Sequence, residues 1–372
     1  MVGSGPAGAA AGHHLARTGH EVVLLDRSRF PRPKTCGDWI TRGALSELEH
    51  MGLPRPRLRE LADRFAEIRG STVGAPNGQT SHVSLRGQAP GACIPRHIFD
   101  ALLVQRAQEV GCKFEHQPVR DPATLLPEFD LVIDARGVYA GEANTVALRA
   151  YWTVPTTRAD EFTRSTVQLF TVNRFRMGYG WVFPVNVTRE HVEINLGVGI
   201  WREEYDAQNV NIREEFEHFV EHNPVTRRLA KVANEQGRTR GHHLALANGR
   251  VRVASGGVLR VGDAANLTDP ITGEGIANAI LAGRLAAQAI DGARDPEQAQ
   301  RRWQRAYEER LLPELNAAIR LRRMLIGTRR KNLALWALKR SKGLAERFHG
   351  SLEGVVSYRE VLPLPRLFDR VP

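Results

Sequence analysis

A glycine-rich turn at the start of the chain, Gly3-Ser-Gly5-Pro-Ala-Gly8, constrains the fold more than any other feature. It has the spacing G-x-G-x-x-G. In this pattern the first glycine permits a tight turn, the second lets a pyrophosphate approach the backbone, and the third allows close helix–sheet packing. The helix that follows offers free N–H groups and a partial positive charge to phosphates. The turn therefore predicts a dinucleotide site built from Gly3, Gly5, Pro6, Ala7 and Gly8.

The residues after the turn support this interpretation. Residues 9–18 are rich in helix formers and Gly19 ends that helix, after which residues 21–26 have the composition of a buried strand. Asp26 ends the strand about 20 residues beyond the turn, where an acid accepts the ribose hydroxyls, and Arg27 follows it. Only Met1 and Val2 precede the turn, where a strand is expected, so we expect the natural start of the protein to lie upstream.

A second pair of motifs lies late in the chain. Val261-Gly-Asp-Ala-Ala265 follows a predicted strand, and Pro270-Ile-Thr-Gly-Glu-Gly-Ile276 opens a helix of small residues that extends to Ile290. Asp263 can accept hydrogen bonds from the ribitol chain of a flavin, and a helix N-terminus near its pyrimidine edge stabilises the anionic reduced form. The predicted cofactor contacts here are Gly262, Asp263, Pro270, Gly273, Gly275 and Ile276.

Two weaker features complete the set. Pro95–Asp100 opens an amphipathic helix, predicted over residues 98–110, with Arg96 placed to pair with cofactor phosphates or to stack nearby. Asp130–Asp134 is a short buried strand that ends in a glycine turn at Gly137.

The order of these patterns predicts an α/β fold with a discontinuous Rossmann-like domain, an inserted β-rich domain and a C-terminal helical region. The Rossmann-like domain takes residues 1–60, 92–150 and 250–298. The β-rich substrate domain takes 61–91 and 151–249, with one helical insert near 211–222 and short strands within 52–91. Residues 299–372 form the helical region.

The four blocks, in this order, resemble the para-hydroxybenzoate-hydroxylase-type FAD fold, and within it the geranylgeranyl reductase-like family. Phe30–Asp38 is similar to the family's segment ahead of the isoalloxazine ring, which adds Cys36 and Gly37 to the FAD contacts. Gly178–Pro184, followed by Gly197-Val-Gly199, resembles its substrate-domain signature, and Ser357-Tyr-Arg359 fits its C-terminal region.

The resemblance implies an FAD-dependent oxidoreductase that reduces carbon–carbon double bonds of an isoprenoid or another apolar, polyketide-like natural product. Members of the wider fold hydroxylate or halogenate their substrates, and a few use FAD largely as a scaffold. An FAD monooxygenase or halogenase, and a cyclase or binding protein without net redox chemistry, are therefore the alternatives.

Cys36, Tyr179 and Trp181 are the candidate catalytic residues. The resemblance implies a functional thiol at Cys36, whereas a small buried side chain is the alternative reading. Tyr179, Trp181 and Phe183 alternate with period two, so they share one face of a strand. That face either roofs an apolar substrate cavity or belongs to an ordinary sheet core.

The sequence is compatible with more than one electron donor. The chain has no second G-x-G-x-x-G motif and hence no separate nicotinamide domain, so NAD(P)H visits transiently or reduced ferredoxin or another reductase delivers the electrons. The family usually has Ala-Asp-Gly where this chain has Ala135-Arg136-Gly137. The Ser and Arg that normally follow are shifted or replaced around 144–149, in a block that handles flavin and NADPH in the family.

Charge and composition bear on which partners the protein binds: nucleic acid, a membrane surface or a metal ion. The net charge is +11, concentrated near the C-terminus, yet the chain shows no nucleic-acid module, and we expect no nucleic-acid partner. Residues 311–325 and 333–344 mix leucines with arginines and lysines, which suits either a peripheral membrane contact or packing on the nucleotide domain. The three cysteines have unrelated spacings, which predicts no disulfide framework, and we therefore expect a cytoplasmic protein. The pairs His13–His14 and His242–His243 lack further metal ligands and predict no metal site.

Overall fold

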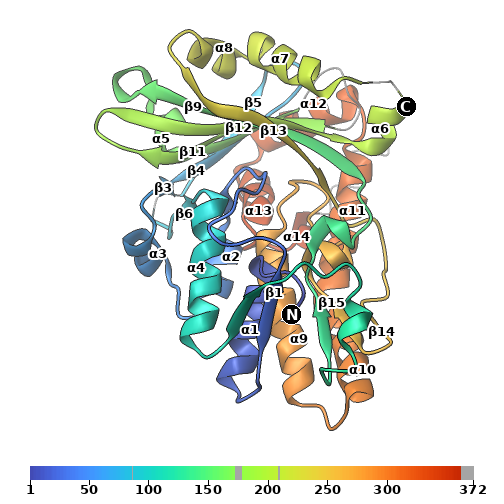
Figure 1. Cartoon of the computed structure of the whole chain (residues 1–372). Coiled ribbons are helices and arrows are strands. Elements are labelled where there is room, and N and C mark those ends of the chain that lie inside the picture. Colours follow the sequence, from blue (N-terminus) through green and yellow to red (C-terminus); the bar gives the residue numbers. More distant parts are fainter. Residues whose placement is uncertain (86, 172–177, 208–209, 362–372) are drawn as a thin grey trace.

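Two stacked layers make up the computed structural model, which describes residues 1–85, 87–171, 178–207 and 210–361. A Rossmann-like part holds both glycine motifs, and a large, mostly antiparallel sheet lies above it in Figure 1. The combination confirms the predicted fold class, an α/β chain with a Rossmann-like unit and a β-rich unit.

The Rossmann-like sheet forms around the first residues of the chain. Val2 makes parallel bridges to Leu25 and to Asp134, and so joins a two-stranded sheet to a three-stranded one. The strands are β1 (Val23–Asp26), β7 (Lys113–His116), β8 (Val132–Asp134), β15 (Val258–Arg260) and the antiparallel edge β14 (Ala254–Ser255). The helices of this part are α1 (Pro6–Arg17), α4 (Arg96–Glu109) and α9 (Ile276–Asp291).

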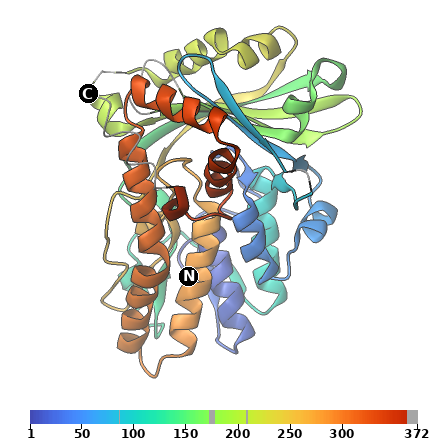
Figure 2. The same cartoon turned by 180° about the vertical axis from the view of Figure 1, so that it is seen from behind.

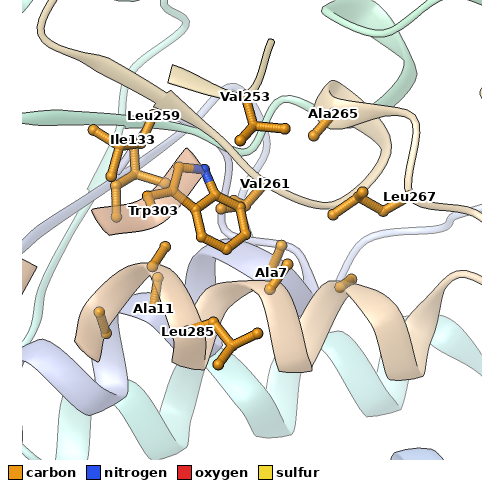
Figure 3. Close-up of a cluster of buried hydrophobic side chains, with 14 of the residues drawn as sticks. Ala7, Ala11, Ile133, Val253, Leu259, Val261, Ala265, Leu267, Leu285 and Trp303 are labelled. Carbon is orange, nitrogen blue, oxygen red and sulfur yellow. The ribbon is translucent and has the colours of Figure 1, made fainter. Parts of the chain in front are cut away.

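Small residues let α1 and α9 pack closely. A Cβ added at Gly283 of α9 would collide with the carbonyl oxygen of Ala7 in α1. Within the turn itself, a Cβ at Gly8 would collide with the carbonyl oxygen of Gly3. Figure 3 shows the core that results, with Ala7, Ala11 and Leu285 beneath the indole of Trp303. The buried Trp303 donates its indole N–H to the Arg260 carbonyl at 3.1 Å, so its polar atom is satisfied.

The large sheet has seven strands among the described residues, and its central strands are buried on both faces, whereas the edge strand β13 is mostly exposed. In spatial order the strands are β13 (Asn234–Leu244), β9 (Thr145–Pro155), β12 (His191–Trp201), β11 (Gly178–Val187), β10 (Thr166–Thr171), β4 (Gly70–Gly74) and β5 (Thr80–Ser84). One face packs with α7 (Ile212–His222) and α8 (Pro224–Ala230), and the other contributes to a core shared with the C-terminal helices. The alternation along β11 and β12 sends residues to both cores.

Several helices lie where only strands or loops were expected. The predicted insert near 211–222 is confirmed as α7, but α5 (Glu161–Ser165), α6 (Arg202–Ala207) and α8 were missed. Helix α3 (Arg55–Leu61) lies in the proline-rich stretch and was also missed, whereas α2 (Arg42–Glu49) lies where the sequence has a helical pattern, over residues 42–51. Pro56 and Pro224 fall in the first turns of α3 and α8, where proline needs no N–H partner, so the prolines there start helices instead of preventing them. A small sheet, β2 (Trp39–Ile40), β6 (Gly91–Cys93) and β3 (Ala66–Ile68), lies beside them.

The C-terminal helices cover the back of both layers, as Figure 2 shows in orange and red. They are α10 (Pro296–Ala306), α11 (Leu312–Met324), α12 (Thr328–Arg340), α13 (Lys342–Leu352) and α14 (Tyr358–Val361). Leu315 and Leu321 of α11, and Leu335 and Leu338 of α12, are buried in the core, as packing on the protein requires. Among the described residues no helix combines the length and hydropathy needed to cross a bilayer. Positions 362–372 of the predicted helical region lie outside the described residues.

Candidate functional site

A cavity of about 700 Å³ lies between the Rossmann-like part and the large sheet, and we call it the main cavity. Its size is within the usual range for a bound organic ligand. Most of the predicted site residues line it: Gly3, Gly5, Pro6, Ala7, Asp26, Arg27, Cys36, Gly37, Arg96, Tyr179, Trp181, Gly262, Asp263, Gly273, Gly275 and Ile276. Two do not: Gly8 packs behind the turn, and Pro270 lines a neighbouring pocket.

The glycine turn forms one end of the main cavity. Gly3 has a φ of 96° and lies so close to the Ala135 carbonyl that a Cβ would collide with it, so the position requires glycine. Helix α1 then begins with Gly5 as its N-cap, and no side chain caps its first turn. The free N–H groups of that turn, with the positive end of the helix dipole, make an anion site for a pyrophosphate.

Asp26 lies at the end of β1 beside this turn and is 6% exposed. Its carboxylate accepts the backbone N–H of Ser4 at 2.8 Å and that of Ser28 at 2.9 Å. These bonds fix the side chain while each oxygen retains a further lone pair for a ribose hydroxyl. Next to it, the Arg27 guanidinium lies 3.9 Å from the centre of the Tyr139 ring, and both residues line the cavity.

The β15–α9 connection forms the opposite wall. Asp263 follows Gly262 and accepts a hydrogen bond from the Thr268 hydroxyl at 2.7 Å. Helix α9 begins after Gly275, whose residue type offers no capping side chain, so part of its first turn faces the cavity uncapped. Glu274 bonds the Ala277 N–H at 2.9 Å, and burial raises the pKa of this carboxyl to about 7.

A buried polar network holds the Cys36–Asp38 segment against the large sheet. Asp38 has a φ of 67° and accepts hydrogen bonds from the Tyr151 hydroxyl, the Asn195 amide at 2.7 Å and the Arg96 backbone N–H at 3.1 Å. The Asn195 amide also bonds the Cys36 carbonyl at 2.7 Å. The network fixes the backbone that carries the Cys36 side chain into the cavity.

The aromatic side chains of β11 form the cavity roof. Tyr179, Trp181 and Phe183 follow one another on one face, with ring centres 6.0 and 6.5 Å apart, as their period of two predicted. The Trp181 indole N–H is satisfied by the Asn195 side-chain oxygen at 2.9 Å, so the roof presents little unpaired polarity. The Tyr179 hydroxyl donates to the Thr272 carbonyl beside the start of α9.

Tyr179 and Thr272 separate the main cavity from a smaller apolar pocket of about 130 Å³. We call it the apolar pocket. Its lining is mostly aliphatic and aromatic, with Leu169 and Phe170 from β10 and Leu335 and Leu338 from α12. The apolar pocket therefore lies between Tyr179 and the C-terminal helices, next to the roof of the main cavity.

Two arginines have closer partners than the sequence suggested. Arg96 is paired with Asp100 through two hydrogen bonds of 2.6 and 2.8 Å, and Asp100 lies 3.3 Å from Arg32 as well. Its charge is thus largely neutralised within the protein. Arg136, which departs from the family pattern, forms an ion pair with Asp134 at 2.8 Å and lines the cavity beside the turn.

Sequence reasoning missed Lys34 and His242, which meet inside the main cavity. The Lys34 ammonium lies 2.6 Å from the Nε2 atom of His242, which comes from β13. Burial lowers the pKa of Lys34, although Asp263 opposes that shift, and burial next to Lys34 lowers the pKa of His242 to about 4. Lys34 lies within the segment quoted for the resemblance, but no local signal joins it to a histidine 208 positions away.

The comparisons with known proteins agree with this geometry. The family model described as FAD binding domain matches residues 1–121, which include the glycine turn and Asp26. A digeranylgeranylglycerophospholipid reductase from Methanocaldococcus jannaschii is 26% identical over 359 residues, 87% of this chain and 85% of that protein. A menaquinone reductase from Mycolicibacterium smegmatis is 26% identical over 320 residues, 78% of this chain and 75% of that protein.

Over most of its length the chain thus resembles the geranylgeranyl reductase-like family of FAD-dependent oxidoreductases. The fold of this flavoprotein is shared by a geranylgeranyl bacteriochlorophyll reductase-like protein from Thermoplasma acidophilum, with a TM-score of 0.69 and 21% identity over 87% of this chain and 86% of that one. A flavin-dependent brominase has the same fold, with a TM-score of 0.74 and 20% identity over 99% and 96% of the two chains.

Proposed function

We propose that this flavoprotein reduces carbon–carbon double bonds of an isoprenoid or a similar apolar natural product. The observation that carries the proposal is the aromatic roof of the main cavity, with the apolar pocket on the other side of Tyr179. Such a surface suits a long apolar chain. A polar aromatic substrate would not need an apolar surface of this length. The names of the two reductase relatives support the same substrate class.

The protein's own residues would hold FAD along the cavity. The turn at Gly3–Gly8 would bind the pyrophosphate, Asp26 the ribose and Asp263 the ribitol chain, while the N-terminus of α9 would favour negative charge on the ring. Gly37 and Gly273 line the cavity and lie so close to the Phe183 and Tyr179 side chains that a Cβ would collide with them, so these segments pack tightly against the roof. Bound and reduced, FAD supplies the hydride for such a reduction.

Cys36 would complete the reaction as a proton donor. Burial raises the pKa of its thiol, opposed in part by the charge of Arg96, so the group carries its proton at neutral pH. It lines the cavity on a backbone that Asn195 and Asp38 hold in place. A reduced double bond needs one proton as well as a hydride, and a protonated thiol can deliver it without admitting bulk water.

The electrons would come from outside this chain. We expect NAD(P)H to visit the main cavity transiently, or reduced ferredoxin or another reductase to deliver the electrons. Lys34 and Arg27, both on the cavity lining, offer positive charge to a nicotinamide cofactor's phosphates.

The direct test is a substrate-driven reoxidation of the flavin. The FAD-loaded protein is reduced chemically under anaerobic conditions and mixed with a geranylgeranyl lipid or a menaquinone, while the flavin absorbance is followed. We expect the oxidised spectrum to return with one saturated double bond per flavin. A flavin that stays reduced with every prenyl compound supplied would contradict the proposal.

The variant Cys36→Ala should slow this reoxidation on the order of 100-fold or more, because the proton donor is lost, while FAD stays bound. Cys112→Ala is the matched control, since that thiol is buried in the core of the Rossmann-like part, away from the cavity. Equal rates in the two variants would remove Cys36 from the reaction.

A further inference from the structure

A small basic pocket lies beside the main cavity, beneath the β9–β13 edge of the large sheet. It measures about 190 Å³ and shares Pro33, Lys34 and Arg96 with the main cavity. Its other basic side chains are His97, Arg149, Arg238 and Arg240, Tyr151 also lines it, and none of its described lining residues is Asp or Glu. We call it the basic pocket.

Arg149 is the residue that the basic pocket leaves unexplained. It is 5% exposed, and its Nε atom is buried without a hydrogen-bond partner. Across the described residues its guanidinium has no ion pair, and its contact is with the Tyr151 ring, 4.0 Å from the ring centre. Burial raises the pKa of Asp38 and the charge of Arg149 opposes that shift, so Asp38 supplies part of its counter-charge. The Nε–H of Arg149 nevertheless stays unbonded, and a buried guanidinium with an unpaired donor favours a further anionic partner.

The acids nearby are already engaged. Asp38 accepts hydrogen bonds from Tyr151, Asn195 and the Arg96 backbone, and Asp100 pairs with the side chains of Arg96 and Arg32. Asp38 is thus within electrostatic reach of Arg149, but among the described residues no carboxylate lines the basic pocket itself.

The sheet register adds a second positive charge on the same face. Arg240 of β13 pairs directly opposite Arg149 of β9, and Gln236 pairs opposite Tyr151. Like charges opposite one another destabilise a sheet. The register shifts between Gln236 and Arg240, where Gly237 has a φ of 72°, so this irregular stretch of β13 borders the pocket. An oxyanion between the two arginines would relieve the repulsion.

We propose that the basic pocket binds a phosphate-type oxyanion through Arg149 and Arg240, at a subsite separate from the pyrophosphate site of the glycine turn. Two molecules could carry this group: a substrate whose apolar chain lies in the main cavity, or a nicotinamide donor. The first source rests on the proposed function. The shared wall of Lys34 and Arg96 places the anion next to the main cavity in either case.

The test measures binding of inorganic pyrophosphate to the oxidised, FAD-loaded protein by titration calorimetry at fixed salt. We expect saturable binding that Arg149→Gln and Arg240→Gln each weaken by at least about 10-fold, because charged hydrogen bonds are lost. Arg240 is exposed, so its variant should fold even if Arg149→Gln does not. Arg301→Gln, an exposed arginine of α10, is the control for the overall positive charge and should bind as tightly as the natural protein. Absence of saturable binding, or full affinity in Arg240→Gln, would overturn the proposal.

Two kinetic comparisons then identify the source. If the substrate carries the anion, Arg240→Gln should raise the KM for geranylgeranyl diphosphate and leave that for geranylgeraniol unchanged. If the donor carries it, the variant should slow flavin reduction by NADPH more than by NADH. Pyrophosphate binding needs no turnover, so a failed binding test overturns this proposal alone, whereas absent double-bond reduction overturns only the proposed function.

Discussion

Asp38 illustrates how single residues decide the geometry of this site. It is fully buried, adopts a left-handed backbone conformation and is bonded by Tyr151, Asn195 and Arg96. The sequence pattern included Asp38 in a segment similar to the family's, but it assigned no role to it. Its role depends on Asn195, which arrives from a strand 157 positions later. Short-range sequence patterns identify residues that contact a ligand. They do not identify distant residues, such as Asn195, that keep those contact residues in position.

Asp26 gives the simplest residue-scale prediction. Asp26→Ala should weaken FAD binding by about 1–3 kcal/mol, because the ribose hydroxyls lose their acceptor while the glycine turn remains. The measurement is the dissociation constant of FAD by fluorescence quenching, with the exposed Asp130→Ala as control. An unchanged dissociation constant in Asp26→Ala would show that the ribose lies elsewhere.

Glu353 predicts a pH effect on stability. It is 1% exposed, and burial raises its pKa to about 7, opposed in part by Arg42. Between the usual glutamate value and pH 7 the unfolded chain ionises Glu353 and the folded one does not, so this residue's contribution to stability falls as pH rises through that window and is constant above it.

The variant Glu353→Gln cannot ionise at this position, so it does not lose stability as the pH rises. Its free energy of unfolding relative to the natural protein should rise by up to about 3 kcal/mol from pH 5 to pH 8. Denaturant unfolding at both pH values measures the difference. A constant offset between the two proteins at all pH values would show that Glu353 titrates normally.

At the scale of elements, helix α1 and strand β1 were predicted because their signals are local. A glycine turn, a run of helix formers and a buried apolar strand follow one another within the first 26 residues. Helices α3 and α8 were not predicted, because proline in a first turn looks like a loop signal until the cap before it is known. Asn223 provides that cap for α8, accepting the N–H groups of Val225 and Thr226.

The close packing of α1 on α9 is testable at one glycine. Gly283→Ala should lower stability by about 1–3 kcal/mol, because the new methyl group would meet the Ala7 carbonyl and push the helices apart. Gly343→Ala in α13 is the matched control: its added methyl group meets no atom, so it should be neutral or stabilising by up to about 1 kcal/mol. Equal effects of the two changes would show that α9 has room to shift.

For the whole molecule, the order of motifs was enough to predict an α/β flavoprotein fold, and the structure and the relatives confirm it. The cavity itself could not be predicted, because its walls meet through long-range register. Asn195 lies opposite Tyr151, and Lys34 meets His242, only once β13, β9, β12 and β11 are paired in that order. The basic pocket depends on the same pairing, because Arg149 and Arg240 lie opposite one another only when β9 and β13 are in this register.

The central claim is that the main cavity carries out a net reduction of an apolar double bond. The measurement that tests it most directly is the product mass, recorded with chemically reduced FAD-loaded protein in the presence and absence of oxygen. The account predicts a product two hydrogens heavier than the substrate, formed without oxygen. A product that forms only with oxygen and gains one oxygen atom, or an isomer of unchanged mass formed equally well with oxidised flavin, would contradict it.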